Sequence, residues 1–208
     1  MKRRGVFITF EGTDGVGKTT QARLLKQAFE QRGRKVMLTR EPGGGPLAEK
    51  IRDLLLNPSV KMEHLTELFL YQSARIEHVN KLIRPALQKG WVVLCDRFTD
   101  ATLAYQGGGR GIPARTIDTL NRMATNGLKP DLTILLDLPV RSGLAKARRV
   151  KGHMDRIEKQ GLGFQERVRT GYRRLARREP RRIRTIPVQN SAETTQSQIQ
   201  AIVFRKFP

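Results

Sequence analysis

Apolar residues recur along the chain with two different spacings. Short apolar runs rich in β-branched and aromatic residues are typical of buried strands, whereas apolar residues three and four positions apart are typical of helices. Runs of the first kind lie at 6–10, 35–39, 91–95, 132–136 and 184–188. Helical spacing is found over 21–32, 47–56, 63–89, 113–126, two parts of 141–182, and 192–207, and 99–111 is predicted to be a loop or a short helix.

This alternation predicts an α/β fold, with a five-stranded parallel sheet flanked by helices. The length of 208 residues suits one domain spanning 1–208 with a full core. In sheets of this kind, ligands bind at the carboxyl ends of the strands. The predicted strand ends carry a glycine-rich loop at 12–17, then Arg40, the pair Asp96-Arg97, and Asp137. We therefore expect these residues to converge on one cleft.

The first predicted strand leads into the run GTDGVGKT, which fits the phosphate-loop pattern of a glycine, four free positions and Gly-Lys-Thr. Its glycines allow the backbone N–H groups to curl around a phosphate, and the following helix adds the positive end of its dipole. In such loops Lys18 reaches the β- and γ-phosphates, and the Thr19 hydroxyl ligates Mg²⁺. A chance glycine turn is the alternative, but it would have to match every fixed position and both flanks. The predicted nucleotide-binding residues are Gly12, Thr13, Asp14, Gly15, Val16, Gly17, Lys18, Thr19 and Thr20.

The charge of the chain is strongly positive. Forty lysines and arginines against 19 acidic residues give a formal net charge of +21, and much of the excess falls between Arg141 and Arg184. Such a balance is typical of nucleic-acid binding, or of the attraction of polyanionic small substrates such as nucleotides.

Cysteine usage and hydropathy point to a cytoplasmic protein without a membrane partner. The single cysteine, Cys95, lies in an apolar run and is expected to be a buried thiol in a reducing compartment. The first apolar run ends at Glu11 and is too short for a signal peptide, and no segment approaches the length of a membrane span.

Five motifs together resemble the bacterial thymidylate kinases, a family of P-loop nucleoside monophosphate kinases, and the resemblance covers nearly the whole chain. They are EGTDGVGKTT at 11–20, TREPGG at 39–44, Ala74-Arg75 with His78, DRF at 96–98 with AYQG at 104–107, and DRIE at 155–158. The phosphate loop is shared by many NTPases, whereas REPGG and the DR…AYQ pair are more specific. The resemblance implies transfer of the ATP γ-phosphoryl group to dTMP, with Mg²⁺, by a homodimer. Leu65, Leu68, Phe69 and Val79 could supply a helix interface or equally belong to the core.

Two charged residues follow the third predicted strand. The Asp96 carboxylate can orient Mg²⁺-bound water, while the Arg97 guanidinium can hold a phosphate bidentately; a structural salt bridge is the alternative. By resemblance, Arg40 and Arg97 both face the dTMP phosphate. Asp14 is, by resemblance, near the sugar and phosphate of the acceptor, and we assign it to the catalytic group.

Gly15 bears on the source of a further cation. One branch of the resembled family has arginine at this position, and the other supplies an arginine from a mobile lid, here predicted at about 141–160. Such a cation would neutralise the charge that develops on the transferred phosphoryl group. The candidates are Arg148, Arg149, Lys151 and Arg156, of which Arg149 and Arg156 are the predicted catalytic residues. A solvated helix face is the interpretation for most of 167–182.

The base pocket is implied by the resemblance. Tyr71 would stack on thymine, Arg75 would donate to a thymine carbonyl, and Thr102 would bind the base edge. Tyr105 would lie against the deoxyribose, with Gln106 close by. Without the resemblance, Tyr71 and Tyr105 would be interpreted as core aromatic residues. Three residues depart from the family pattern on the acceptor side: Gly45 for Thr or Ser, Tyr71 for Phe, and Ala101 for Ser.

Two alternative functions remain open. A kinase for another nucleoside monophosphate would share the phosphate loop and lid, but should lack the AYQ segment. A nucleic-acid-binding ATPase would account for the charge, but the few aromatic residues do not interleave with the basic runs, so no specific nucleic-acid partner is predicted. The three histidines share no metal-ligand spacing and the lone cysteine excludes a thiolate site, so Mg²⁺ is the only metal expected.

Overall fold

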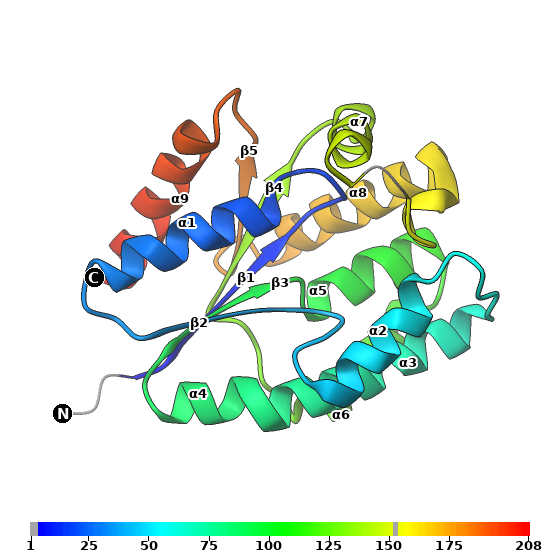
Figure 1. The fold of residues 1–208 in the computed structure, drawn as a ribbon, viewed down its shortest axis with the longest axis horizontal. Helices are drawn as coiled ribbons and strands as arrows, with labels where there is room; N and C mark the ends of the chain where they lie inside the picture. The colour runs from blue at the N-terminus through cyan, green and yellow to red at the C-terminus, as the bar shows by residue number, and fades with distance from the viewer. Residues whose placement is uncertain (1–3, 152–153) are drawn as a thin grey trace.

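The computed structural model describes residues 4–151 and 154–208, and the side chains of residues 150 and 151 are not part of this description. Within these ranges, five strands form one parallel sheet in the order β2-β3-β1-β4-β5 (Figure 1). The predicted α/β fold with a five-stranded parallel sheet is confirmed. The strands are β1 (Val6–Glu11), β2 (Val36–Arg40), β3 (Val92–Asp96), β4 (Leu132–Asp137) and β5 (Ile183–Pro187).

Helices cover both faces of the sheet. On one face lie α1 and α9, and on the other lie the α3–η1–α4 segment and α8, with α2 and α6 packed against α3 (Figure 1). The bounds are α1 (Lys18–Glu30), α2 (Pro46–Leu56), α3 (His64–His78), η1 (Val79–Ile83), α4 (Arg84–Gln88), α5 (Thr99–Thr102), η2 (Leu103–Gly109), α6 (Ala114–Thr125), α7 (Val140–Lys151), η3 (Glu158–Gln160), α8 (Gly161–Arg178) and α9 (Ala192–Lys206).

Strand β1 is buried on both faces because it lies in the middle of the sheet. Its even-numbered residues, such as Ile8 and Phe10, pack in the cluster with α1 and α9, whereas Phe7 packs on the other face against Phe98. This two-sided burial explains why the strand is a continuous apolar run instead of an alternating one. The position of β1 between β3 and β4 brings three strand ends together at one edge.

The predicted helix over 63–89 is not a single α-helix. Helix α3 passes into the π-helical turn η1 and then into α4, where Pro85 occupies the first turn. The backbone stays helical from η1 into α4, and the Arg84 N–H donates to the Val79 carbonyl oxygen, so Pro85 lies inside a continuous helical segment directly after the π-helical turn. Such turns and prolines are the places where the α-helical hydrogen-bond pattern is interrupted. The 99–111 segment is largely helical, as α5 and the π-helical segment η2. No helix among the described residues is long and apolar enough to cross a membrane.

Candidate active site

A cavity of about 360 Å³ opens at the carboxyl ends of β1, β2 and β3. It brings together the loop at 12–17, Arg40 and the pair Asp96-Arg97, which confirms that these three strand ends converge. Asp137, at the end of β4, was expected there too, but it does not line the cavity and instead pairs with Arg169 and Arg173, each at 2.7 Å. Among the predicted site residues, its lining includes Asp14, Gly15, Gly17, Lys18, Thr19, Thr20, Arg40, Tyr71, Arg75, Asp96, Arg97, Thr102, Tyr105 and Gln106. Gly12, Thr13, Val16, Arg149 and Arg156 are predicted site residues that do not line it.

The loop after β1 has the backbone of a phosphate cradle. Gly12, Gly15 and Gly17 have φ angles of 136°, 76° and 93°, in a region that residues with a Cβ rarely adopt. Helix α1 begins immediately after Gly17, so its N-terminal N–H groups face the same space. The Lys18 ammonium is buried and donates to the Thr13 carbonyl oxygen at 2.9 Å. Burial, followed by the nearby positive charge of Arg97, lowers the pKa of Lys18 to about 8.

Two oxygen ligands meet beside this loop. The Thr19 hydroxyl donates to Asp96 Oδ2 at 2.6 Å, which joins the start of α1 to the end of β3. Mg²⁺ prefers oxygen ligands and uses one or two protein oxygens together with water and phosphate oxygens. The donor set of Thr19 and Asp96 therefore fits this ion.

Arg97 lies in the wall of the cavity and is held by four acceptors. Its Nη1 donates to the Gly12 carbonyl oxygen at 2.8 Å and to the Tyr172 hydroxyl at 3.1 Å. Its Nη2 donates to Asp14 Oδ1 at 2.6 Å and to the Tyr105 hydroxyl at 2.9 Å. Arg97 therefore forms an ion pair with Asp14, as the alternative interpretation expects, and both residues also line the cavity; its contact with a phosphate stays a prediction.

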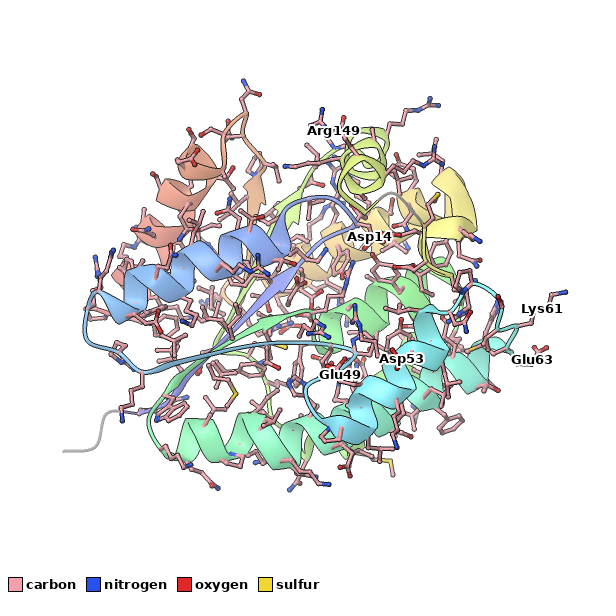
Figure 2. The ribbon with its side chains drawn as sticks, in the orientation of Figure 1. Asp14, Glu49, Asp53, Lys61, Glu63 and Arg149 are labelled. Carbon is pink, nitrogen blue, oxygen red and sulfur yellow. The ribbon has the colours of Figure 1, made fainter. Side chains whose placement is uncertain are left out.

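The other arginines of the acceptor side are held differently. Arg40, at the end of β2, is half-exposed and forms an ion pair with Glu49 at 2.9 Å; Glu49 lies in the first turn of α2 (Figure 2). Arg52 also lines the cavity and donates to the Pro42 carbonyl oxygen at 2.7 Å. Sequence reasoning missed Arg52, because a single arginine on an amphipathic helix carries no signal of its own.

Arg75 is only 2% exposed and lies against the cavity from α3. Its Nε donates to Glu41 Oε2 at 2.8 Å, and its Nη1 donates to Asn121 Oδ1 at 2.7 Å. Glu41 also contacts His78 Nδ1 at 3.0 Å through Oε1. Although burial raises the pKa of Glu41, the charge of Arg75 and the contact with His78 outweigh it and lower that pKa. Glu41 thus stays charged and fixes the Arg75 guanidinium.

The predicted base and sugar residues surround the same space. Tyr105 is buried, its ring lies 4.7 Å from the Arg97 guanidinium carbon, and its hydroxyl contacts Asp14 Oδ2 at 3.3 Å. The Gln106 side-chain nitrogen donates to Glu67 Oε1 at 2.8 Å, which leaves the amide oxygen for a donor in the cavity. Tyr71 and Thr102 complete this wall. Both tyrosines therefore line the cavity and are not simply core residues.

The lid residues are arranged differently from the prediction. Arg149 lies on α7 at the top of the view in Figure 2, above Asp14, and its side chain is exposed. Arg156 is only 8% exposed, and its guanidinium pairs with Glu67 at 2.7 Å. The Lys151 side chain lies outside the described residues. Arg148 is exposed and does not line the cavity.

Among the α7 residues whose side chains are described, Lys146 and Ala147 line the cavity. They lie one turn beyond Gly143, which packs on the phosphate loop at Gly15. The sequence offered no sign of this, because the rotation of α7 depends on that contact. Asp155, Ile157 and Glu158, from the DRIE motif, also line the cavity.

Comparison with known proteins agrees with this geometry. The family model for thymidylate kinase matches residues 10–199. The chain is 50% identical to a thymidylate kinase of Pseudomonas putida (strain GB-1) over 96% of this chain and 95% of that protein. It is 48% identical to one of Geotalea uraniireducens (strain Rf4) over 98% of each chain. A crystal structure of thymidylate kinase from Ehrlichia chaffeensis superimposes with a TM-score of 0.78 at 34% identity, covering 96% of this chain and 99% of that one. The chain belongs to the thymidylate kinase family.

Proposed function

We propose that the chain transfers the γ-phosphoryl group of ATP to dTMP, giving dTDP and ADP. The observation that carries this proposal is the meeting of the phosphate loop with Arg97, Tyr105 and Gln106 in one cavity. These three residues belong to the DR…AYQ motif pair, which is far more specific than a phosphate loop. Family membership supports the same reaction.

The donor side is formed by the loop and the start of α1. The backbone N–H groups of 12–17 surround the β- and γ-phosphates, and Lys18 releases its contact with the Thr13 carbonyl to reach them. Thr20 lines the cavity at the first turn of α1. Phosphoryl transfer depends on positioning and electrostatics, so these fixed donors lower the barrier without bond-making of their own.

Thr19 and Asp96 would hold Mg²⁺, which would supply positive charge beside the donor phosphates. The carboxylate and hydroxyl are already 2.6 Å apart, so they present their oxygens to one point.

The acceptor side is formed by Arg97 and Arg40. The four hydrogen bonds that Arg97 donates use its Nη protons and fix the plane of its guanidinium, which leaves the Nε–H and the positive charge to hold the dTMP phosphate. Asp14 sets the position of Arg97 and lies near the acceptor sugar. Arg40 exchanges its exposed pair with Glu49 for the phosphate.

Thymine is read by buried polar groups. The Arg75 Nη2 group donates to the Phe98 carbonyl oxygen at 3.2 Å, which leaves a second Nη2 proton for a base carbonyl. Tyr71 stacks on the base, and Thr102 and Gln106 bind its edge. A pocket with such fixed donors discriminates strongly, because a wrong base leaves them unpaired.

The proposal is tested by a coupled assay of ADP release over a panel of nucleoside monophosphates. We expect dTMP to be the preferred acceptor and the Lys18→Ala variant to lose most turnover while remaining folded by circular dichroism. A clear preference for another monophosphate would move the chain to a sister kinase. Near-normal turnover in folded Lys18→Ala would remove the phosphate loop from the mechanism.

The remaining expectations concern the whole protein. The chain acts as one domain spanning 1–208, with a lid at about 141–160, in the cytoplasm and without a specific nucleic-acid partner. It forms a homodimer through the face of α2, α3 and α6. Of the four candidate interface residues, Leu68 and Val79 are buried in the core, whereas Leu65 and Phe69 are each 54% exposed. The large apolar residues that are exposed on these three helices are Leu47, Leu54, Leu65, Phe69, Ile76 and Met123.

A further inference from the structure

Glu11, the last residue of β1, is fully buried, and the reaction described above gives it no role. Its Oε1 accepts the backbone N–H of Phe98 at 2.7 Å. Its Oε2 accepts the hydroxyl of Tyr172, on α8, also at 2.7 Å. A buried carboxyl group is costly unless its oxygens are paired, and here each oxygen has a donor.

Both donors are connected to Arg97: Phe98 follows it in the chain, and Tyr172 accepts a hydrogen bond from its guanidinium. The Arg97 backbone has a φ of 73°, a left-handed conformation that is unfavourable for a residue with a side chain. The Arg97 N–H donates to the Phe10 carbonyl oxygen at 2.9 Å, and the next N–H, of Phe98, donates to Glu11. Phe10 and Glu11, which are neighbours in β1, therefore accept the two backbone N–H groups that flank the strained Cα atom of Arg97.

The second branch reaches the guanidinium. The Tyr172 hydroxyl accepts from Arg97 Nη1 at 3.1 Å while it donates to Glu11. Burial raises the pKa of Tyr172 well above its ordinary value, so this hydroxyl keeps its proton and can donate and accept together. Glu11 is thus connected to Arg97 at two points: to the Arg97 backbone through the N–H of the next residue, Phe98, and to the Arg97 guanidinium through the Tyr172 hydroxyl.

We propose that Glu11 is a positioning residue that, directly at Phe98 N and through Tyr172, sets the conformation in which Arg97 presents its guanidinium to the acceptor phosphate. The inference rests on the proposed role of Arg97. Burial, followed by the Asp100 carboxylate, raises the pKa of Glu11 to about 8. Glutamine has the same size and, like the protonated carboxyl group, no charge, but a carboxyl group keeps an accepting lone pair on both oxygens whether or not it is protonated. The glutamine amide oxygen keeps the Phe98 contact, but its NH₂ group cannot accept from Tyr172.

Glu11→Gln, Tyr172→Phe and their double variant test this link at pH 7. We expect each single change to raise the KM for dTMP roughly fivefold to tenfold, because one hydrogen bond to a charged group is weakened. The KM for ATP should stay within about twofold. The double variant should be no worse than the more impaired single variant, because both changes cut the same link.

Thr9→Val is the matched control. The change removes the buried Thr9 hydroxyl from β1. That hydroxyl contacts the Thr133 hydroxyl at 2.8 Å and does not contact Arg97. We expect the change to lower Tm and leave the KM for dTMP unchanged. The inference is overturned if the Glu11 and Tyr172 variants behave as Thr9→Val does, or if their effects on the KM for dTMP multiply. If Glu11→Gln does not fold, the test rests on Tyr172→Phe alone: its KM for dTMP should rise while its KM for ATP stays nearly unchanged. Failure of the proposed function would appear separately, as a wild type that does not phosphorylate dTMP.

Discussion

Gly15 of the phosphate loop lies against the backbone of Gly143 in the first turns of α7. A Cβ atom added to Gly15 would overlap the Gly143 carbonyl oxygen, and one added to Gly143 would lie 2.5 Å from the Asp14 carbonyl oxygen. Two glycines thus allow the lid helix to rest directly on the loop. An arginine at position 15 would be incompatible with this packing, which accounts for the glycine there.

Gly15→Ala should therefore lower both stability and turnover. The left-handed φ of 76° alone costs an alanine about 1–2 kcal/mol, and the overlap with Gly143 displaces α7 in addition. Gly33→Ala is the matched control, because Gly33 has a φ of 71° and open space around it. We expect similar backbone costs in thermal unfolding for both variants, but a loss of kcat only for Gly15→Ala. Equal kcat values in the two variants would mean that the contact does not place the lid.

Lys146→Ala should lower kcat on the order of a hundredfold, with a smaller rise in the KM for dTMP. Among the described side chains of the proposed lid, Lys146 is the cation that lines the cavity, and a cation acting on the transferred phosphoryl group stabilises mainly the transition state. Arg149→Ala is the comparison, since Arg149 was predicted from sequence and lies outside the cavity in this structure. A larger loss of kcat in Arg149→Ala would show that α7 rotates when ATP binds.

Arg156→Ala should instead lower Tm, because it leaves Glu67 without one of its partners.

Tyr105 should exclude the 2′-hydroxyl of a ribonucleotide. Its ring lies in the acceptor wall, so a ribose hydroxyl there would be buried without a partner, at a cost of about 1–3 kcal/mol. We expect Tyr105→Ala to lose activity on dTMP but to lose less on ribothymidine monophosphate, as measured by kcat/KM for each. Tyr105→Phe keeps the ring and removes the hydroxyl that contacts Arg97 and Asp14, so it should retain the sugar preference. An unchanged ratio in Tyr105→Ala would show that the ring does not read the sugar.

Phe69→Glu should convert the proposed homodimer to a monomer. Phe69 and Leu65 are each 54% exposed on α3, and a buried unpaired carboxylate is incompatible with an apolar interface. Lys61→Glu is the control, because it introduces the same side chain at an exposed position on the loop before α3 (Figure 2). Molecular mass from light scattering distinguishes the two variants. A wild type that is monomeric at micromolar concentration would rule out the interface.

The phosphate loop and the strands could be predicted from sequence because both are local. The loop is a contiguous run whose function depends on backbone N–H groups, so its glycines and Lys18 identify it without knowledge of the fold. Strands such as β1 and β3 are apolar runs whose length and composition are sufficient to recognise them. The parallel topology followed from their alternation with helices, and the convergence of strand ends followed from the topology.

The tertiary structure decided which side chains face the cavity. Arg149 and Lys146 are indistinguishable in a basic helical run, and the choice between them depends on the rotation of α7, set by the contact of Gly143 with Gly15. Arg156 reads as a lid cation in sequence, but it forms a buried pair with Glu67 on a distant helix. Glu11 and Tyr172 are separated by 161 positions and meet at Arg97 only because α8 packs against η2, β4 and β5 and so brings Tyr172 to the end of β1. Such contacts depend on the packing of distant elements, and no local pattern encodes them.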